Sequence, residues 1–348
     1  MKSLLPLLAA GWASLLSASG GPAAADGPAA GGPAVACEAV ETADAVQITT
    51  PHLEAAICKR GYVSGVKSHT FLDKKTGARD PGFGLDIADW IMEPGSDLAY
   101  RDRLDKALVY ENNLYHGRSP KRSIEGPQIC TQARELHPEL IRGRDFVAVK
   151  QQYTYRIAAP GKNTGSRWTQ ILVFPAGTRY FLSMDRIDTV NASEGMFLRI
   201  DMPGHVRHKQ GDTFRQIYLS YHGLIPATEF LHDFRPDDRF DYRRGRDPLP
   251  PRFIRAIELR DPATGKTGPW LAGMTLEPSV VSEAWCHERG YVCMIEEFGQ
   301  RPIRPGQSFS AAFIVGYFDS VEEMQQVYDR YRGFTGLEAT AAGWKLTR

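Results

Sequence analysis

Hydrophobic and polar residues alternate along the segment between Arg167 and His222. In the range 197–202, Leu198, Ile200 and Met202 take every second position, and Arg199 and Asp201 stand between them. The range 214–222 repeats the pattern, with Ile217, Leu219 and Tyr221 on one side and Gln216, Tyr218, Ser220 and His222 on the other. Because the side chains of a strand point alternately to its two faces, the pattern predicts strands with one apolar and one polar face.

Similar short runs continue along the chain from about Val46 and are separated by turns rich in Gly, Pro, Asn and Asp. These turns include residues 74–77, 160–163, 175–177, 203–204 and 261–265. Regular turns of this kind are typical of an antiparallel β-sandwich rather than of alternating strands and helices. We therefore expect a mostly-β fold, a β-sandwich or supersandwich, with a single domain over residues 46–348.

One helix is expected near the C-terminus. Ser320 and Glu323 form a capping box, and Met324, Val327 and Tyr328 then recur at helical spacing. Residues 102–108 are a second and shorter helical candidate. Residues 235–252, dense in Asp, Arg and Pro, indicate a long loop that is either a binding loop or a charged excursion.

The N-terminal residues predict an export signal. Lys2 precedes a short apolar run from Leu4 to Leu16, and three small residues at positions 23–25 stand before Asp26. We expect residues 1–25 to be a signal peptide and residues 26–45 to be a linker rich in Ala, Gly and Pro. The protein would then be secreted or periplasmic. No segment is long and apolar enough to predict a membrane span.

Charge is balanced over the whole chain. Its 348 residues include 42 Lys and Arg against 41 Asp and Glu, for a formal net charge of +1. This balance gives no indication of nucleic-acid binding, which strongly basic chains favour. The predicted polar faces are nevertheless rich in Arg and His, so their positive charge is local, and such a group favours a specific anionic ligand.

Candidate substrate-binding residues come from these polar faces and from the loop 203–213. Tyr and Trp offer flat apolar surfaces to sugar rings, and Arg offers forked donors to carboxylates. The candidates are Arg156, Arg167, Trp168, Arg179, Asp201, Arg207, His208 and Lys209. The alternative is a solvated face on which Arg and Asp pair across strands.

Four residues are candidates for catalysis: His222, Tyr218, His205 and Arg199. His222 or His205 would take a proton, Tyr218 would protonate a leaving oxygen, and Arg199 would neutralise a carboxylate. These roles together make β-elimination at a uronate, the chemistry of polysaccharide lyases. The alternative is that Tyr218 is a half-buried strand residue and His222 belongs to a turn.

The segment 285–293 predicts a β-hairpin that turns at Arg289-Gly290. A two-residue loop there places Cys286 opposite Cys293, so we expect a disulfide between them. The chain has five cysteines, and the odd number leaves at least one without a partner in the same chain.

The same register places Glu283 opposite Glu296, on the face shared by Trp285 and His287. Directly opposed like charges are destabilising unless a metal, an Arg or a shared proton compensates. Glu283 and Glu296 could therefore be the two carboxylates of a glycosidase or ligands of Ca²⁺. A salt bridge to a nearby Arg is the structural alternative.

The start of the domain resembles a known fold family. Residues 53–57, 61–66 and 71–77 read as strand, strand and turn, and the turn has the form Asp-x-x-Thr-Gly. This opening resembles that of galactose-mutarotase-like β-supersandwich domains of carbohydrate-active proteins. The resemblance implies the fold. The mutarotase pattern of an early His pair and a late Glu is not recognisable, so the resemblance does not imply epimerase activity.

Other motifs change the picture little. The loop 112–117 carries His116, a candidate ligand-binding residue, whereas Asp86 and Asp89 precede Trp90 in a run that indicates a structural role. The sequence has no Walker A loop, dinucleotide fingerprint, nucleophile elbow or His-Glu-x-x-His motif. We expect an exported polysaccharide lyase that binds an acidic polysaccharide and needs no cofactor, with Ca²⁺ as an alternative. The rival hypotheses are a glycoside hydrolase and a non-catalytic carbohydrate-binding protein.

Overall fold

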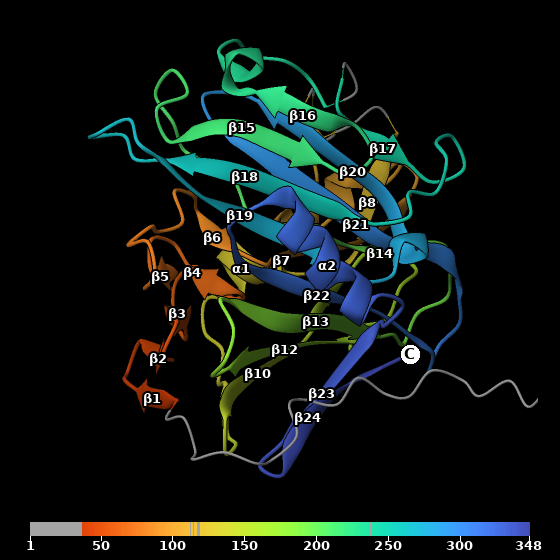
Figure 1. Ribbon diagram of the computed structural model, residues 1–348. Helices are drawn as coiled ribbons and strands as arrows, with labels where there is room; N and C mark the ends of the chain where they lie inside the picture. The colour runs from red at the N-terminus through yellow and green to blue at the C-terminus, as the bar shows by residue number, and fades with distance from the viewer. Residues whose placement is uncertain (1–36, 112, 114, 117–118, 237–238) are drawn as a thin grey trace, which may run out of the picture.

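The structure is a computed structural model that describes residues 37–111, 113, 115–116, 119–236 and 239–348 (Figure 1). The expected signal peptide, residues 1–25, lies outside them. Two large antiparallel sheets form the molecule: sheet A with nine strands, in the order β16-β15-β18-β19-β22-β13-β12-β10-β9, and sheet B with seven, in the order β11-β8-β7-β14-β21-β20-β17. The prediction of a mostly-β sandwich is confirmed.

The strands of sheet A are β9 (Glu139–Arg142), β10 (Phe146–Thr154), β12 (Arg167–Pro175), β13 (Tyr180–Asp188), β15 (Phe214–Leu219), β16 (Gly223–Pro226), β18 (Ile254–Arg260), β19 (Thr267–Thr275) and β22 (Ser308–Phe318). Those of sheet B are β7 (Ile87–Pro94), β8 (Lys121–Gly126), β11 (Ile157–Ala158), β14 (Ser193–Asp201), β17 (Tyr242–Arg243), β20 (Val281–Glu288) and β21 (Val292–Ile303).

Smaller sheets and short helices complete the fold. The small strands are β1 (Glu38–Glu41), β2 (Ala45–Thr49), β3 (Leu53–Cys58) and β5 (Leu72–Asp73), the pair β4 (Val66–Lys67) and β6 (Gly84–Leu85), and the hairpin β23 (Gly336–Thr340) with β24 (Gly343–Thr347). The helices are α1 (Ile129–Gln132) and α2 (Val321–Tyr331), with 3-10 turns η1 (Arg101–Arg103), η2 (Lys106–Leu108), η3 (Ala227–Phe230) and η4 (Pro278–Val280).

Three boundaries differ from those expected. The first strand, β1, begins at Glu38 inside the expected linker, because it pairs with β2 from Glu38 opposite Thr49 to Glu41 opposite Val46. Residues 102–108 form the turns η1 and η2 instead of one helix. The expected loop 235–252 contains β17, which pairs with β20 at the edge of sheet B.

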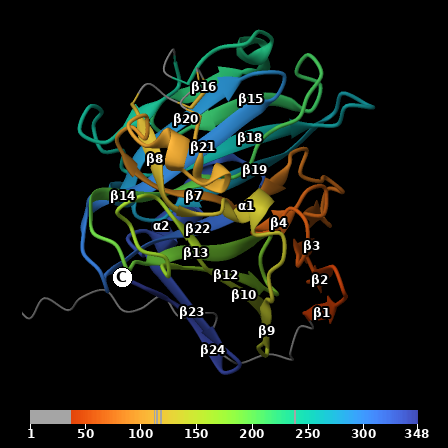
Figure 2. The same ribbon diagram turned by 180° about the vertical axis from the view of Figure 1, so that it is seen from behind.

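The C-terminal helix is confirmed. The side chain of Ser320 accepts a hydrogen bond from the backbone N–H of Glu323 at 3.2 Å, as a capping box requires. Met324, Val327 and Tyr328 are buried against sheet A. The helix α2 lies in front of sheet A in Figure 1, and β7, β8 and α1 come to the front in the reverse view (Figure 2).

The main core lies between the two sheets, and it confirms the alternation read from the sequence. Leu198 and Ile200 of β14 in sheet B and Ile217 and Leu219 of β15 in sheet A belong to one buried cluster. Tyr218 lies on the other side of β15, in a second cluster under α2. The polar faces of β14 and β15 therefore point away from each other, on opposite sides of the sandwich. Arg199 and Tyr218, which the predicted reaction combines, do not share one surface.

Candidate active site

A cleft of about 450 Å³ opens on the outer side of sheet B. It combines residues of β7, β14, β20, β21 and α1 with residues of several connecting loops. It holds carboxyl, imidazole, guanidinium and phenol groups. The polar and aromatic residues that line it include Tyr62, Phe83, Asp89, Trp90, Tyr110, Asn113, His116, Gln128, Arg199, Asp201, His205, Trp285, His287, Arg289 and Tyr291. Six of the predicted site residues thus meet here: His116, Arg199, Asp201, His205, Trp285 and His287.

Asp201 and His205 form a pair at the surface of the cleft. Nε2 of His205 lies 3.3 Å from Oδ2 of Asp201, and the backbone N–H of Met294 donates to Nδ1 of His205 at 3.1 Å. Because Nδ1 is an acceptor, the proton of the neutral ring is on Nε2, the nitrogen nearer to Asp201. The two side chains are 12% and 9% exposed, so a ligand in the cleft can reach the pair.

The segment that carries His205 is fixed by close backbone packing. A Cβ on Gly82 would lie 1.9 Å from the carbonyl oxygen of His205, and one on Gly204 would lie 2.1 Å from the carbonyl oxygen of Gly84. Only glycine permits both approaches. They hold the residues around His205 against the segment that carries Phe83.

The surroundings of Asp89 and Asp201, two carboxyl residues of the cleft, shift the pKa of each. Burial raises the pKa of Asp89 to about 6, although Arg199 and hydrogen bonds from Gln128 and Cys130 lower it in part. Burial, followed by the neighbouring Asp89, raises the pKa of Asp201 well above its ordinary value. A group that gains or loses a proton near neutral pH is suited to acid–base work.

Three imidazoles of the cleft are held neutral. Burial lowers the pKa of His205 to about 3, that of His116 to about 4 and that of His287 to about 2, and nearby cationic groups lower each further. Neither ring nitrogen of His287 has a hydrogen-bond partner within the described residues, and the ring packs beside Tyr115 at 5.3 Å. His287 therefore has hydrogen-bonding capacity that a ligand could use after a shift of Tyr115.

Two aromatic rings and two guanidinium groups form the rim of the cleft. The rings of Phe83 and Tyr291 lie 4.8 Å apart, Arg207 stacks over Phe83 at 3.9 Å, and Arg289 donates to the phenol oxygen of Tyr291 at 2.6 and 3.0 Å. Among the described residues, neither guanidinium has a carboxylate within salt-bridge distance. The rim therefore offers flat surfaces together with unneutralised positive charge.

A buried charge cluster lies beside the cleft. Nζ of Lys121 is 2.7 Å from Glu283 and 2.8 Å from Glu297, and Arg199 donates to Glu297 at 2.6 and 2.9 Å. Arg199 also donates to the hydroxyl of Tyr110. Its guanidinium is fully engaged, so the predicted role of neutralising a substrate carboxylate does not suit Arg199.

The predicted hairpin exists, but its register is shifted by one residue. Glu288 pairs with Val292, so the loop has three residues instead of two, and Cys286 faces Met294 while His287 faces Cys293. Neighbouring positions of a strand point to opposite faces. Cys286 and Cys293 therefore lie on opposite sides of sheet B as free thiols, and the predicted disulfide is wrong.

The shift also separates the predicted glutamate pair. Glu283 is opposite Glu297, and Lys121 lies between their carboxylates. Glu296 points into the space between the sheets, where it accepts a hydrogen bond from the hydroxyl of Thr275 at 2.5 Å. Glu283 and Glu296 are thus not brought together as a catalytic or Ca²⁺-binding pair. The opposed carboxylates are instead those of Glu283 and Glu297, and the ammonium group of Lys121 compensates their charge.

Two predicted catalytic residues lie outside the cleft. The hydroxyl of Tyr218 accepts a hydrogen bond from Gln325 of α2 at 3.2 Å, on the far side of the molecule. His222 lies in the turn after β15, exposed, with its ring against Phe240 at 4.9 Å. The structural alternatives given for these two residues describe them better.

The remaining predicted binding residues are dispersed. Most of them have structural partners: Arg167 pairs with Asp188, Trp168 is buried and donates to Asp185, Arg179 bridges Asp73 and Asp319, and His208 contacts Glu288. Arg156 is exposed beside Tyr153, and Lys209 is exposed in the turn before Asp212. Only Arg207 of this set reaches the rim of the cleft.

Sequence reasoning missed several residues of the cleft. Tyr62 lies in a segment for which the sequence predicts only a strand, Phe83 belongs to no alternating run, and the pattern around Asp89 indicates only a structural role. Arg289 and Tyr291 belong to the hairpin that was recognised, where His287, Arg289 and Tyr291 recur at every second position. That spacing is a signal for a shared side and could have indicated them.

Comparisons with known proteins bear on the fold alone. No family model matches the chain, and no curated protein matches its sequence. Similar solved structures include a galactose mutarotase-like protein from Clostridium acetobutylicum, with 8% identity, a TM-score of 0.43 and coverage of 82% of this chain and 99% of that one. Galactose 1-epimerase from Lactobacillus acidophilus has 7% identity, a TM-score of 0.43 and coverage of 82% and 98%.

A mutant of a heparan sulfate lyase from Pedobacter heparinus is also similar, with 11% identity, a TM-score of 0.39 and coverage of 82% of this chain and 36% of that one. In the described part of the chain, no helix is long and apolar enough to cross a membrane.

Proposed function

We propose that the cleft binds an acidic saccharide and cleaves it by β-elimination at a uronate. The observation that carries this proposal is the rim: Arg207 and Arg289 have no carboxylate partner among the described residues and flank the rings of Phe83 and Tyr291. A guanidinium prefers the planar, bidentate carboxylate of a uronate, and the aromatic rings suit a sugar face. The Asp201–His205 pair lies beside them, with the His205 ring 5.7 Å from that of Tyr291.

The groups of the cleft can supply each part of the reaction. Arg289 would neutralise the uronate carboxylate and so acidify the adjacent C–H. Asp201, oriented by His205, would take that proton, a C=C bond would form, and the C–O bond to the leaving sugar would break. The hydroxyl of Tyr291 would give its proton to the leaving oxygen. The raised pKa of Asp201 makes its ionised form a stronger base than an ordinary carboxylate.

The test is turnover of a panel of uronate polysaccharides, followed by ultraviolet absorbance of the unsaturated product. We expect activity to rise with pH through the raised pKa of Asp201, because the base acts only when ionised. Asp201→Asn should abolish turnover, and Arg289→Gln should lower kcat and raise KM. His222→Ala, a change outside the cleft, should leave both constants unchanged. No absorbance on any polysaccharide from folded protein would defeat the proposal.

One observation favours a second candidate, glycoside hydrolysis. Asp89 and Asp201 are two carboxyls of one cleft, and burial raises the pKa of each, as the general acid of a glycosidase requires. Hydrolysis would release reducing ends without absorbance, and Asp89→Asn would abolish it. In β-elimination the same change should move the pH profile to lower pH, because Asp89 helps to raise the pKa of Asp201.

A further inference from the structure

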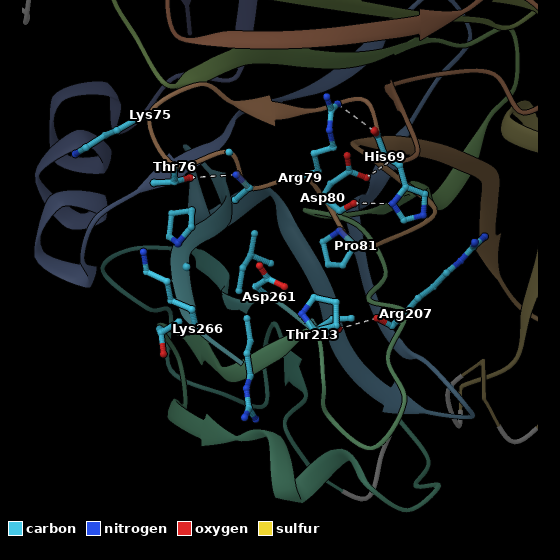
Figure 3. Close-up of a pocket in the computed structure, with 18 of the residues that line it drawn as sticks. His69, Lys75, Thr76, Arg79, Asp80, Pro81, Arg207, Thr213, Asp261 and Lys266 are labelled. Atoms are coloured by element: carbon cyan, nitrogen blue, oxygen red, sulfur yellow. Dashed lines mark hydrogen bonds between the residues drawn. The ribbon is translucent and has the colours of Figure 1, made fainter. Parts of the chain in front are cut away.

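A second and larger hollow lies next to the cleft. Its volume is about 830 Å³, and it lies between the turn that follows β5 and the β18–β19 hairpin (Figure 3). Five Lys and Arg residues line it: Lys75, Arg79, Arg207, Arg260 and Lys266. None of them belongs to the catalytic arrangement proposed above except Arg207, which stands at the boundary between the two hollows.

Two of the acidic residues that line this hollow, Asp80 and Asp261, are engaged by backbone N–H groups. Asp80 is buried and accepts the backbone N–H groups of His69 and Phe71, at 2.9 and 3.0 Å. Asp261 accepts the backbone N–H groups of its own turn, at Ala263 and Thr264. These two carboxylates stabilise the local backbone and leave the nearby side chains without an anionic partner.

The third carboxylate, Asp319, pairs with Lys75 at 2.5 Å and with Arg179 at 2.6 Å. Arg79 and Arg260 contact only backbone carbonyls, His69 at 3.4 Å and Gly265 at 3.2 Å. Arg79, Arg260 and Lys266 are exposed and, like Arg207, have no carboxylate in salt-bridge distance within the described ranges. The hollow therefore holds four unneutralised cations.

The two hollows are connected through Arg207. Its backbone N–H donates to the carbonyl of Pro81, which lines the larger hollow, and its guanidinium stacks on Phe83, which lines the cleft. In Figure 3 the Arg207 side chain points away from the other labelled residues, and Lys266 stands on the other side of the hollow. Positive charge thus continues from the cleft into the larger hollow.

We infer that the larger hollow binds a further stretch of the same anionic chain whose uronate is cleaved in the cleft. This inference rests on the proposed function, and it specifies the substrate as a polymer held at internal units. Carboxylates spaced along a polyuronate would meet Arg207 first and then Arg79, Arg260 and Lys266. The exposed ring of Pro262 also lines the hollow and offers apolar contact to a sugar ring.

The experiment compares long and short ligands. The probes are polygalacturonate and trigalacturonate, titrated calorimetrically into the Asp201→Asn protein so that turnover does not interfere. The variant Arg79→Ala/Arg260→Ala/Lys266→Ala removes three cations of the hollow. The control Arg304→Ala/Arg332→Ala/Lys345→Ala removes the same charge from exposed positions that line neither hollow.

We expect the hollow variant to bind the polymer at least roughly tenfold more weakly than the control, and to lose part of the salt dependence of binding. Trigalacturonate is short, so we expect it to occupy the cleft alone and to bind both variants equally. Equal polymer affinity for the hollow variant and the control would overturn the inference, as would equal loss for polymer and trimer or no polymer binding by the parent protein. If the polymer result holds and no unsaturated product is ever seen, the proposed reaction fails while the binding site stands.

Discussion

Lys121 lies between the opposed carboxylates of Glu283 and Glu297, and we expect its positive charge to be required for the stability of the fold. Its side chain is 3% exposed, and those of Glu283 and Glu297 are 6% and 1% exposed. Lys121→Met keeps the length of the side chain and removes its charge. Each carboxylate then keeps one Arg, since Arg243 lies 2.6 Å from Glu283 and Arg199 lies 2.6 Å from Glu297.

Breaking a buried ion pair from one side costs about 3–5 kcal/mol of folding free energy, because the remaining charge stays desolvated. Because each carboxylate keeps one Arg partner, we expect Lys121→Met to lower the free energy of unfolding by an amount at the lower end of this range, about 3 kcal/mol. For a domain of this size, about 2 °C is lost per kcal/mol, so the melting temperature should fall by roughly 6 °C. The exposed pair Lys345 with Glu338, 3.1 Å apart, is the control, and Lys345→Met should cost less than about 1 kcal/mol.

The loss should also depend on pH. Burial opposes ionisation of Glu283, but Lys121 and Arg243 outweigh it and lower its pKa below the ordinary value of 4.5. A group with a lowered folded-state pKa contributes stability above its unfolded pKa and loses it as pH falls through the folded pKa. The difference between the wild-type protein and Lys121→Met should therefore be largest at neutral pH and shrink below the ordinary value of 4.5.

Urea unfolding and thermal melts at several pH values between neutral and acidic would measure both effects. A destabilisation by Lys121→Met no larger than that of Lys345→Met would refute the view that the cluster depends on this cation. A difference that stays constant as the pH falls would refute the electrostatic origin of the effect and indicate lost packing instead.

Two further predictions concern the hairpin and the helix. Cys286 and Cys293 should react with a thiol reagent only after unfolding, because both are buried free thiols, and a mass lower by two hydrogens in the unreduced protein would contradict the observed register. Ser320→Ala should lower the free energy of unfolding by about 1 kcal/mol through loss of the cap to Glu323, and Ser320→Asp, which can also cap, should not.

The local sequence pattern was sufficient to predict which face of a strand is buried and where the C-terminal helix begins. Leu198 and Ile217 lie in the core as the alternation predicts, and Ser320 caps α2 as its spacing predicts. Each of these statements depends on residues a few positions apart. Their geometry follows from the chain itself, because side chains alternate along a strand and a capping box closes within one turn.

The set of residues that form the site could not be predicted in the same way, because the alternation along a strand does not determine which sheet that strand belongs to. Arg199 and Tyr218 each lie on the non-core face of a strand, and the assumption that such faces adjoin placed them in one site. In the structure β14 belongs to sheet B and β15 to sheet A, so the shared core lies between the two residues. Sheet membership is fixed by pairings between distant segments, such as β14 with β7 and β21.

The hairpin shows how small a difference separates two functional hypotheses. With a two-residue loop, Cys286 faces Cys293 and Glu283 faces Glu296; with the observed three-residue loop, Glu283 faces Glu297. The extra loop residue places Glu296 in the interior of the sandwich instead of on the cleft side, and there Glu296 accepts a hydrogen bond from the hydroxyl of Thr275. It also leaves His287, Arg289 and Tyr291 at the mouth of the cleft. The loop of Arg289, Gly290 and Tyr291 thus supplies the guanidinium and the aromatic ring on which the proposed recognition of a uronate depends. The residues most informative for function therefore lie in the turn rather than in the paired strands.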